Sequence, residues 1–164
     1  MPVVSNTSPL LNLAIIDQLN LLPQQFDQVY IPIAVVEELR LDTSLPGVRR
    51  IKQGMESGWL VLRDLSDQNI ATALERDLDH GEAQAIALAL QLGQPIVLID
   101  EHEGRSIAKT MALRPVGVLG ILLRAKVLGH ISEIKPNLLA LQQEAGFYIA
   151  DKLFTSIMKE AGEA

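Results

Sequence analysis

The chain has 164 residues, of which 48% are hydrophobic and 21% charged, and its net charge at neutral pH is −6. This composition excludes an intrinsically disordered chain, and the absence of cysteine excludes disulfides and thiolate metal sites. The acidic balance argues against a generic nucleic-acid binder, and no apolar run approaches the roughly 20 residues that span a bilayer. We therefore expect a single domain over residues 1–164, with no membrane segment and no signal peptide, that acts in the cytoplasm.

The predicted elements alternate between strand and helix along the chain. A short strand at residues 2–5 is followed by a helix with Ser8 as N-cap and Pro9 as first helical residue, and its apolar face runs from Leu10 to Leu21. Further strands are predicted at residues 29–33, 59–62, 95–99 and 114–116. Further helices are predicted at residues 34–39, 48–56, 69–78, 82–92, 101–111 and 118–128, with two more within 136–160 that are separated by 145–147.

The strand at residues 95–99 is a continuous apolar run, which is typical of a strand buried on both faces. Strands that alternate with helices predict a parallel sheet between two helical layers, a three-layer α/β/α sandwich. The carboxyl ends of parallel strands share one edge of the sheet, where α/β proteins place their sites. Polar residues that directly follow a strand are therefore candidates for function.

Asn6 and Asp100 each follow a predicted strand. A carboxylate at the end of so apolar a strand lies in poor surroundings unless something solvates or ligates it, although Asp100 could equally cap the next helix. Glu82 lies in the first turn of an Ala-rich helix that is expected to pack closely on the sheet, where an acid also complements the helix dipole. Only one of the adjacent Glu37 and Glu38 can face a pocket, because neighbours on a helix point about 100° apart.

Several motifs occur in a specific order along the chain. They are VSNTSPLLNLA (residues 4–14), IPIAVVEEL (31–39), LDHGEAQAIALA (78–89), LIDEHEGRSIAK (98–109) and GVLGILLRAKVLGHI (117–131). Over essentially the whole chain this set resembles the PIN domain family of ribonucleases. The resemblance implies a nuclease with four acidic positions around one or two Mg²⁺ or Mn²⁺ ions. Many relatives are toxins of VapC-like toxin–antitoxin pairs, and these are usually dimers.

Carried over residue by residue, the resemblance implies metal ligands at Asn6, Glu38, Glu82 and Asp100, with the last three as catalytic residues. Further candidates are two acids beside matched positions, Asp79 and Glu101. Two hydroxyl residues after the first strand, Thr7 and Ser8, are candidates to position a ligand water. Asn6 departs from the family pattern, which has Asp there. An asparagine oxygen can coordinate a cation but brings no charge, so weaker metal binding and lost catalysis both remain open.

The implied chemistry agrees with the residue types. Mg²⁺ and Mn²⁺ take oxygen ligands, and phosphodiester hydrolysis needs an activated water and charge neutralisation at the leaving oxygen, which such metals supply.

Residues 104–132 contain five basic residues and no acid, which permits a basic face beside an acidic pocket but also fits an ordinary solvated surface. Arg105 and Lys109 lie one helical turn apart, where they could hold substrate phosphates. An ion pair of Arg105 with Glu101 or Glu82 is an equally weighted alternative. Because aromatic residues make up only 4% of the chain, base stacking is a poor expectation, and recognition of substrate shape or exclusion by a partner is favoured.

Three hypotheses follow for function. The first is a metal-dependent ribonuclease that acts on RNA, is the toxin of a toxin–antitoxin pair, and forms a homodimer. The second is a catalytically weak PIN-like module that binds nucleic acid or protein. The third, a phosphatase-like hydrolase on the same three-layer plan, is discounted because it needs an Asp-x-Asp pair where Asn6, Thr7 and Ser8 stand.

Overall fold

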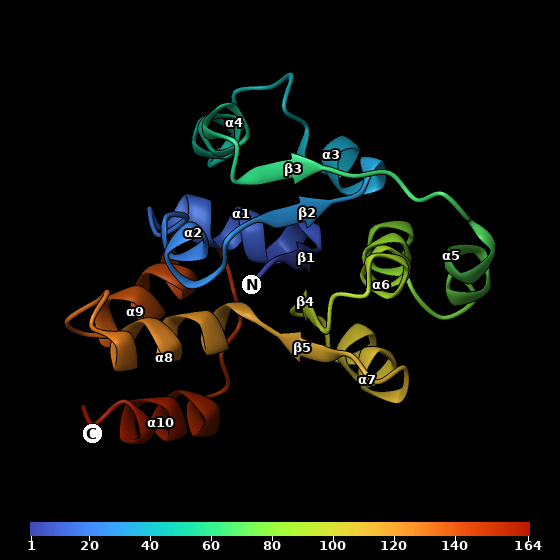
Figure 1. Cartoon of the computed structure of the whole chain (residues 1–164). Coiled ribbons are helices and arrows are strands. Elements are labelled where there is room, and N and C mark those ends of the chain that lie inside the picture. Colours follow the sequence, from blue (N-terminus) through green and yellow to red (C-terminus); the bar gives the residue numbers. More distant parts are fainter.

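The computed structural model describes all of residues 1–164, and its five strands form one parallel sheet in the order β3-β2-β1-β4-β5. The strands are β1 (Val3–Ser5), β2 (Val29–Ile31), β3 (Leu60–Leu62), β4 (Ile96–Leu98) and β5 (Arg114–Val116). Figure 1 shows helices on both sides of this sheet. The predicted three-layer α/β/α fold with a parallel central sheet is therefore confirmed.

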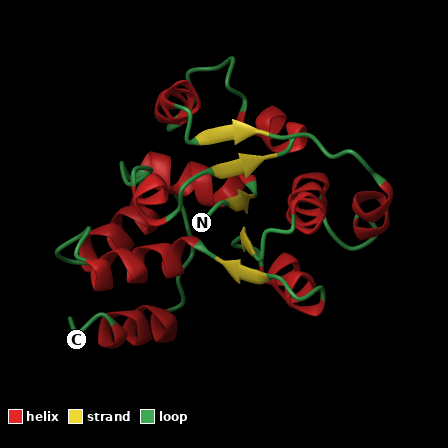
Figure 2. Cartoon of the chain, viewed as in Figure 1, coloured by secondary structure: helices red, strands yellow, loops and turns green.

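Ten helices surround the sheet (Figure 2). They are α1 (Thr7–Ile15), α2 (Leu21–Gln25), α3 (Ile33–Leu39), α4 (Val48–Ser57), α5 (Asn69–Leu74), α6 (His80–Leu92), α7 (His102–Thr110), α8 (Val118–Leu128), α9 (Lys135–Gln143) and α10 (Asp151–Glu160). Helices α5, α6 and α7 share one hydrophobic cluster, whereas the other seven helices share the larger one.

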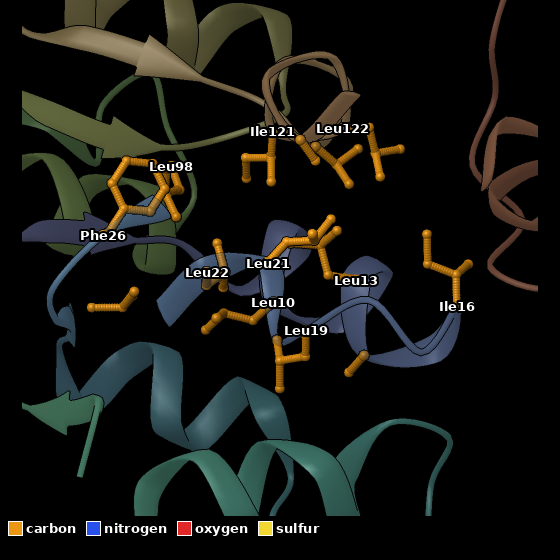
Figure 3. Packing of buried hydrophobic residues seen from close by; sticks show 14 of the residues in the cluster. Leu10, Leu13, Ile16, Leu19, Leu21, Leu22, Phe26, Leu98, Ile121 and Leu122 are labelled. Atoms are coloured by element: carbon orange, nitrogen blue, oxygen red, sulfur yellow. The ribbon is translucent and has the colours of Figure 1, made fainter. Parts of the chain in front are cut away.

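The two central strands supply alternate side chains to these two clusters. Val3 and Leu98 belong to the larger cluster, and Val4 and Val97 to the smaller one, because successive side chains of a strand point to opposite faces. This is why every residue of β1 and of β4 is buried. Figure 3 shows the larger cluster, in which leucines of α1 and α2 pack toward Leu98 and toward residues of α8.

The first helix differs from its prediction at both ends. Asn6, not Ser8, is the N-cap, because its extended backbone still pairs with β4 through an N–H bond of 2.9 Å to the carbonyl of Leu98. Pro9 becomes the third helical residue, where its missing N–H costs nothing. The helix ends at Ile15, and Asp17 reverses the chain with a φ of 60°, so Leu21 lies in a separate short helix.

Other boundaries shift by a few residues. Helix α6 begins at His80, two residues before the predicted start, because Asp79 is its N-cap and accepts the Glu82 N–H at 2.8 Å. The preceding helix ends at Leu74 instead of residue 78. Gly93 ends α6 as predicted, with a φ of 68° that suits glycine. The break between the last two helices covers residues 144–150 and is longer than predicted.

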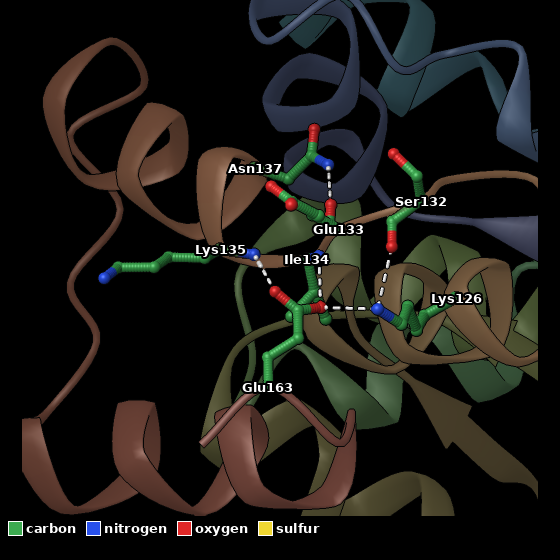
Figure 4. Close-up of polar contacts among 7 residues, drawn as sticks. All are labelled: Lys126, Ser132, Glu133, Ile134, Lys135, Asn137 and Glu163. Carbon is green, nitrogen blue, oxygen red and sulfur yellow. Dashed lines mark hydrogen bonds and ion pairs between the residues drawn. The ribbon is translucent and has the colours of Figure 1, made fainter.

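The C-terminal segment is tied to the body of the protein by Glu163 (Figure 4). Its carboxylate accepts the backbone N–H of Ile134 at 2.6 Å and that of Lys135 at 3.3 Å, and it pairs with Lys126 of α8 at 3.0 Å. These hydrogen bonds, led by that from Ile134, hold the pKa of Glu163 below its usual value. Helix α10, which precedes Glu163, is thereby connected to α8 and to the start of α9.

Candidate functional site

The candidate site lies at the carboxyl edge of the sheet, between β1 and β4. Here the chain order reverses direction across the sheet, since β1 pairs with β2 on one side and with β4 on the other. The register sets Ser5 opposite Leu98, so Asn6 and Asp100 emerge beside each other at this edge. Such a reversal is the usual place for a ligand in parallel α/β proteins.

Asp100 is held by donors from two helices. One carboxylate oxygen accepts the backbone N–H of Val118 at 2.7 Å, and the other accepts the Ser8 hydroxyl at 2.9 Å and the Asn12 amide at 3.4 Å. Burial raises the pKa of Asp100, while these hydrogen bonds and Arg105 oppose the rise. The alternative in which Asp100 caps the next helix is wrong, because Glu101 is the N-cap of α7.

Two buried oxygens at the site have no hydrogen-bond partner. Asn6 is 5% exposed and Glu82 is 6% exposed, and neither Asn6 Oδ1 nor Glu82 Oε2 receives a donor. Desolvation, followed by the neighbouring Asp79 carboxyl, raises the pKa of Glu82 to about 7. Buried acceptors without a donor are uncommon in proteins and call for an explanation, such as an unseen ion.

Glu38 contributes to the site from α3 and lies nearer the surface. Its carboxylate accepts the Thr7 hydroxyl at 2.7 Å. Glu37 and Glu38 are both exposed and both line a cavity of about 530 Å³, but only Glu38 makes a side-chain hydrogen bond. The structure therefore joins Thr7 to Glu38 and Ser8 to Asp100, two of the pairs that sequence reasoning treated as separate candidates.

Each of the three carboxylates lies against a glycine. A Cβ on Gly104 would lie 2.7 Å from Glu82 Oε2, one on Gly117 would lie 2.9 Å from Asp100 Oδ1, and one on Gly81 would collide with the Glu38 carboxylate. These distances are too short for real side chains. The motifs DHGEA, EHEGR and GVLG contain these glycines, but sequence reasoning gave them no role.

The donor set fits a hard divalent cation in kind. The unpartnered Asn6 and Glu82 oxygens are oxygen ligands of the type that Mg²⁺ and Mn²⁺ prefer, and the Asp100 carboxylate lies at the same edge. The acids are nevertheless held in separate sets of contacts, and no three His, Asp or Glu side chains come close enough together to hold one ion. The residue types and their burial suit a divalent cation, but the carboxylates would have to move before they could bind one ion together.

The two basic candidates differ in their surroundings. Arg105 donates from Nη1 to the carbonyl of Ile99 at 3.2 Å, next to Asp100. It makes no ion pair with Glu101 or Glu82, so that structural alternative is wrong. Lys109 lies one turn further along α7, is exposed, and has no partner.

Sequence reasoning missed three residues that surround Asp100. Asn12 lies one helical turn after Ser8 and donates to it at 3.1 Å, a spacing that could have revealed it. Phe147 and Tyr148 line a cavity of about 390 Å³ together with Ser8 and Asp100. Only the fold brings them there, since they lie more than forty residues after Asp100 in the chain.

The chain is thus a three-layer α/β/α protein with one parallel sheet, and its acids and unpartnered buried oxygens lie at the edge where proteins of this class usually bind ligands. A family model described as a PIN domain matches residues 2–163, and the chain belongs to this family, which is a nuclease-type module. Neither a protein of curated function nor a solved structure gives a match. None of the ten helices combines the length and apolar character needed to cross a membrane.

Proposed function

We propose that the chain is an endoribonuclease that depends on Mg²⁺ or Mn²⁺ and hydrolyses RNA phosphodiester bonds at the carboxyl edge of the sheet. The observation that supports this proposal is the pair of buried, unpartnered oxygens on Asn6 and Glu82, beside Asp100, in a PIN domain. Oxygen acceptors without donors suit a cation, and nuclease chemistry gives that cation a use.

The residues divide into three roles under this proposal. Asn6, Glu38, Glu82 and Asp100 would hold the metal. Thr7 and Ser8 orient Glu38 and Asp100 through their hydroxyl groups, and Asp79 and Glu101 add negative charge near Glu82. Arg105 and Lys109 would contact the substrate phosphates. The chemistry that a divalent cation supplies to this reaction is activation of a water and neutralisation of charge at the leaving oxygen.

A catalytically weak module that binds nucleic acid or protein is the second candidate. Two observations favour it. Asn6 stands where the family pattern has an acid, and the acids are not gathered around one point. A site that lacks one of four charges attracts a divalent cation less strongly.

The toxin role, an antitoxin partner, a homodimer and action in the cytoplasm belong to the same proposal and rest on the family resemblance. The exposed Val127 and Leu128, adjacent at the end of α8, offer apolar area for a partner or a second copy. Growth arrest on expression, relieved by a protein encoded beside it, would support the toxin role. Normal growth would contradict it.

Cleavage of a mixed single-stranded RNA pool tests the enzymatic proposal. We expect the wild-type protein to cleave with Mn²⁺ or Mg²⁺ and to stop when EDTA is added. Asp100→Asn keeps the shape but removes a charged ligand, so it should be folded and inactive. Asp42→Asn removes the same charge from an exposed loop and should remain active. RNA binding by wild type without cleavage at any metal concentration would favour the weak module.

A further inference from the structure

A groove continues from the candidate site along the edge of the sheet. A cavity of about 680 Å³ lies between β5, α8 and α10, and Asp100 and Gly117 are among the residues that line it. The cavity of about 390 Å³ that contains Ser8 and Asn12 shares Asp100, Phe147 and Tyr148 with it. The two cavities therefore adjoin at Asp100, and together they form one groove along this edge of the sheet. Of the four proposed metal ligands only Asp100 lines this groove.

The larger arm of this groove is lined by three arginines, one of which, Arg105, lies beside Asp100. Arg105, Arg114 and Arg124 come from α7, β5 and α8, and none of them makes an ion pair. Besides Asp100, the only acid that lines this arm is Glu160 of α10, which is also unpaired. Three of the five basic residues in the acid-free stretch 104–132 thus meet in one place, where an anionic chain is the complementary ligand.

The arm is long enough for more than one nucleotide. Arg124 lies six residues after Val118, which corresponds to roughly 9 Å along α8. Stacked nucleotides are about 3.4 Å apart along a strand, so the arm extends over more than one phosphate from Asp100.

An exposed aromatic side chain stands where the two arms meet. Tyr148 is 85% exposed and its hydroxyl makes no hydrogen bond within the chain, so its ring is free to contact a ligand in the groove. The adjacent Phe147 is half-buried against the larger core cluster, and its N–H bonds to the Leu141 carbonyl at 2.9 Å. Phe147 thereby fixes the backbone that presents Tyr148 beside Asp100.

We propose that this groove binds single-stranded RNA, with Tyr148 stacking on a base next to the cleaved phosphate and with Arg114 and Arg124 contacting phosphates further along. The proposal rests on the proposed ribonuclease function and extends it to the path of the substrate. A stacking aromatic and unpaired cations along a groove are the features by which proteins hold single strands without reading their sequence. The low aromatic content of the chain is then no objection, because one well-placed ring suffices.

Equilibrium binding of a labelled, unstructured RNA in EDTA tests the groove without requiring cleavage. Tyr148→Ala should weaken binding by about 5- to 150-fold, Tyr148→Leu by a similar factor, and Tyr148→Phe only slightly, because phenylalanine retains the ring face. Arg124→Ala should weaken binding and lower the slope of log K against log salt by about 0.7. Arg49→Ala is the matched control, since Arg49 is an exposed, unpaired arginine on α4, outside the groove.

The results distinguish the proposed RNA-binding groove from the proposed ribonuclease activity on which it rests. If the Tyr148 and Arg124 variants bind as expected but no protein cleaves RNA with Mn²⁺, the groove stands and the nuclease assignment fails. If the wild type cleaves RNA while Tyr148→Ala and Arg124→Ala bind as it does, the groove is overturned and the nuclease stands. An equal loss in Arg49→Ala would also overturn the groove, because the effect would then be one of net charge alone.

Two further measurements address other occupants of the groove. Binding of the same RNA annealed to its complement with equal affinity would overturn the assignment to a single strand, because a paired base cannot stack on Tyr148. Sedimentation of Leu153→Asp, which places a charge on the α10 wall, should show the same oligomeric state as wild type. Conversion of a dimer to a monomer by this change would show that a second copy fills the groove.

Discussion

Gly104→Ala is the most direct test of the close packing between α7 and the site. A Cβ at this position would lie 2.6 Å from Ile99 Cδ1 and 2.7 Å from Glu82 Oε2. Ile99 is fully buried and Glu82 nearly so, so neither can swing into solvent to make room. The added methyl group must therefore displace α7 or the Glu82 carboxylate.

The size of the effect follows from two opposing terms. Alanine is favoured over glycine in a helix by about 1 kcal/mol, while overpacking a buried site costs about 1–3 kcal/mol. The net change in unfolding free energy is then a loss of about 0–2 kcal/mol. Gly120 occupies the same third position in α8, and its Cβ would be no closer than 3.4 Å to Val116. Gly120→Ala should therefore gain up to about 1 kcal/mol.

Urea unfolding of both variants at neutral pH measures these terms, and their difference of about 1–3 kcal/mol isolates the steric part. In thermal melts the two variants should differ by roughly 2–12 °C, since 1 kcal/mol corresponds to about 2–4 °C in a chain of this size. Gly104→Ala should also reduce RNA cleavage, because Glu82 is displaced. Equal stabilisation by both substitutions would refute the packing of Gly104 against Glu82.

Three other predictions follow from the contacts described above. Glu163→Gln should destabilise the protein at neutral pH. Its difference from wild type in unfolding free energy should shrink as pH falls through the lowered pKa of Glu163, because the stabilisation is present only while this carboxylate is ionised. Urea midpoints that differ equally at neutral and acidic pH would contradict this prediction. Arg105→Ala should weaken RNA binding and lower its salt slope by about 0.7, whereas an unchanged slope with a lower Tm would show that Arg105 only supports the Ile99 carbonyl. Asn6→Asp should lower Tm without metal and regain it with Mn²⁺, since a fourth carboxylate adds repulsion in the free site and attraction to a bound cation; equal metal-induced shifts in both proteins would remove Asn6 from the site.

The placement of Asn6 and Asp100 at one edge of the sheet was predictable because it depends on strands that are easily recognised. The strand before Asp100 is continuously apolar and followed at once by a carboxylate, and Asn6 follows the other central strand. Parallel connections then place both residues at one edge. The three-layer fold and the family resemblance were confirmed on this basis.

The start of the first helix could not be predicted from local signals. Ser8 and Pro9 carry the residue types of an N-cap and a first helical turn. The helix nevertheless begins at Thr7, because the N–H of Asn6 bonds to β4, ninety-two residues further along the chain at Leu98. A tertiary hydrogen bond thus decided which residue ends the strand and caps the helix.

The roles of the glycines and of Tyr148 depend even more on distant contacts. Gly104 matters because α7 approaches Glu82 of α6, and composition alone gives no sign of that approach. The fraction of aromatic residues predicts how many rings a chain has, but not that Tyr148 stands exposed beside Asp100. The roles of such residues can be recognised only from the contacts between elements that are distant in the sequence.

The asparagine at position 6 limits the negative charge that the metal-free protein must bury at the site. A buried acceptor without a donor costs about 1–3 kcal/mol, and both Asn6 and Glu82 carry one. If position 6 were also a carboxylate, the metal-free protein would bear a further buried charge at the edge of the sheet where Asp100 lies, at a larger cost. Asparagine keeps an oxygen at the ligand position while sparing the metal-free fold that charge. The departure from the family pattern is thus compatible with a site that still takes a cation, with lower affinity and a more stable empty state.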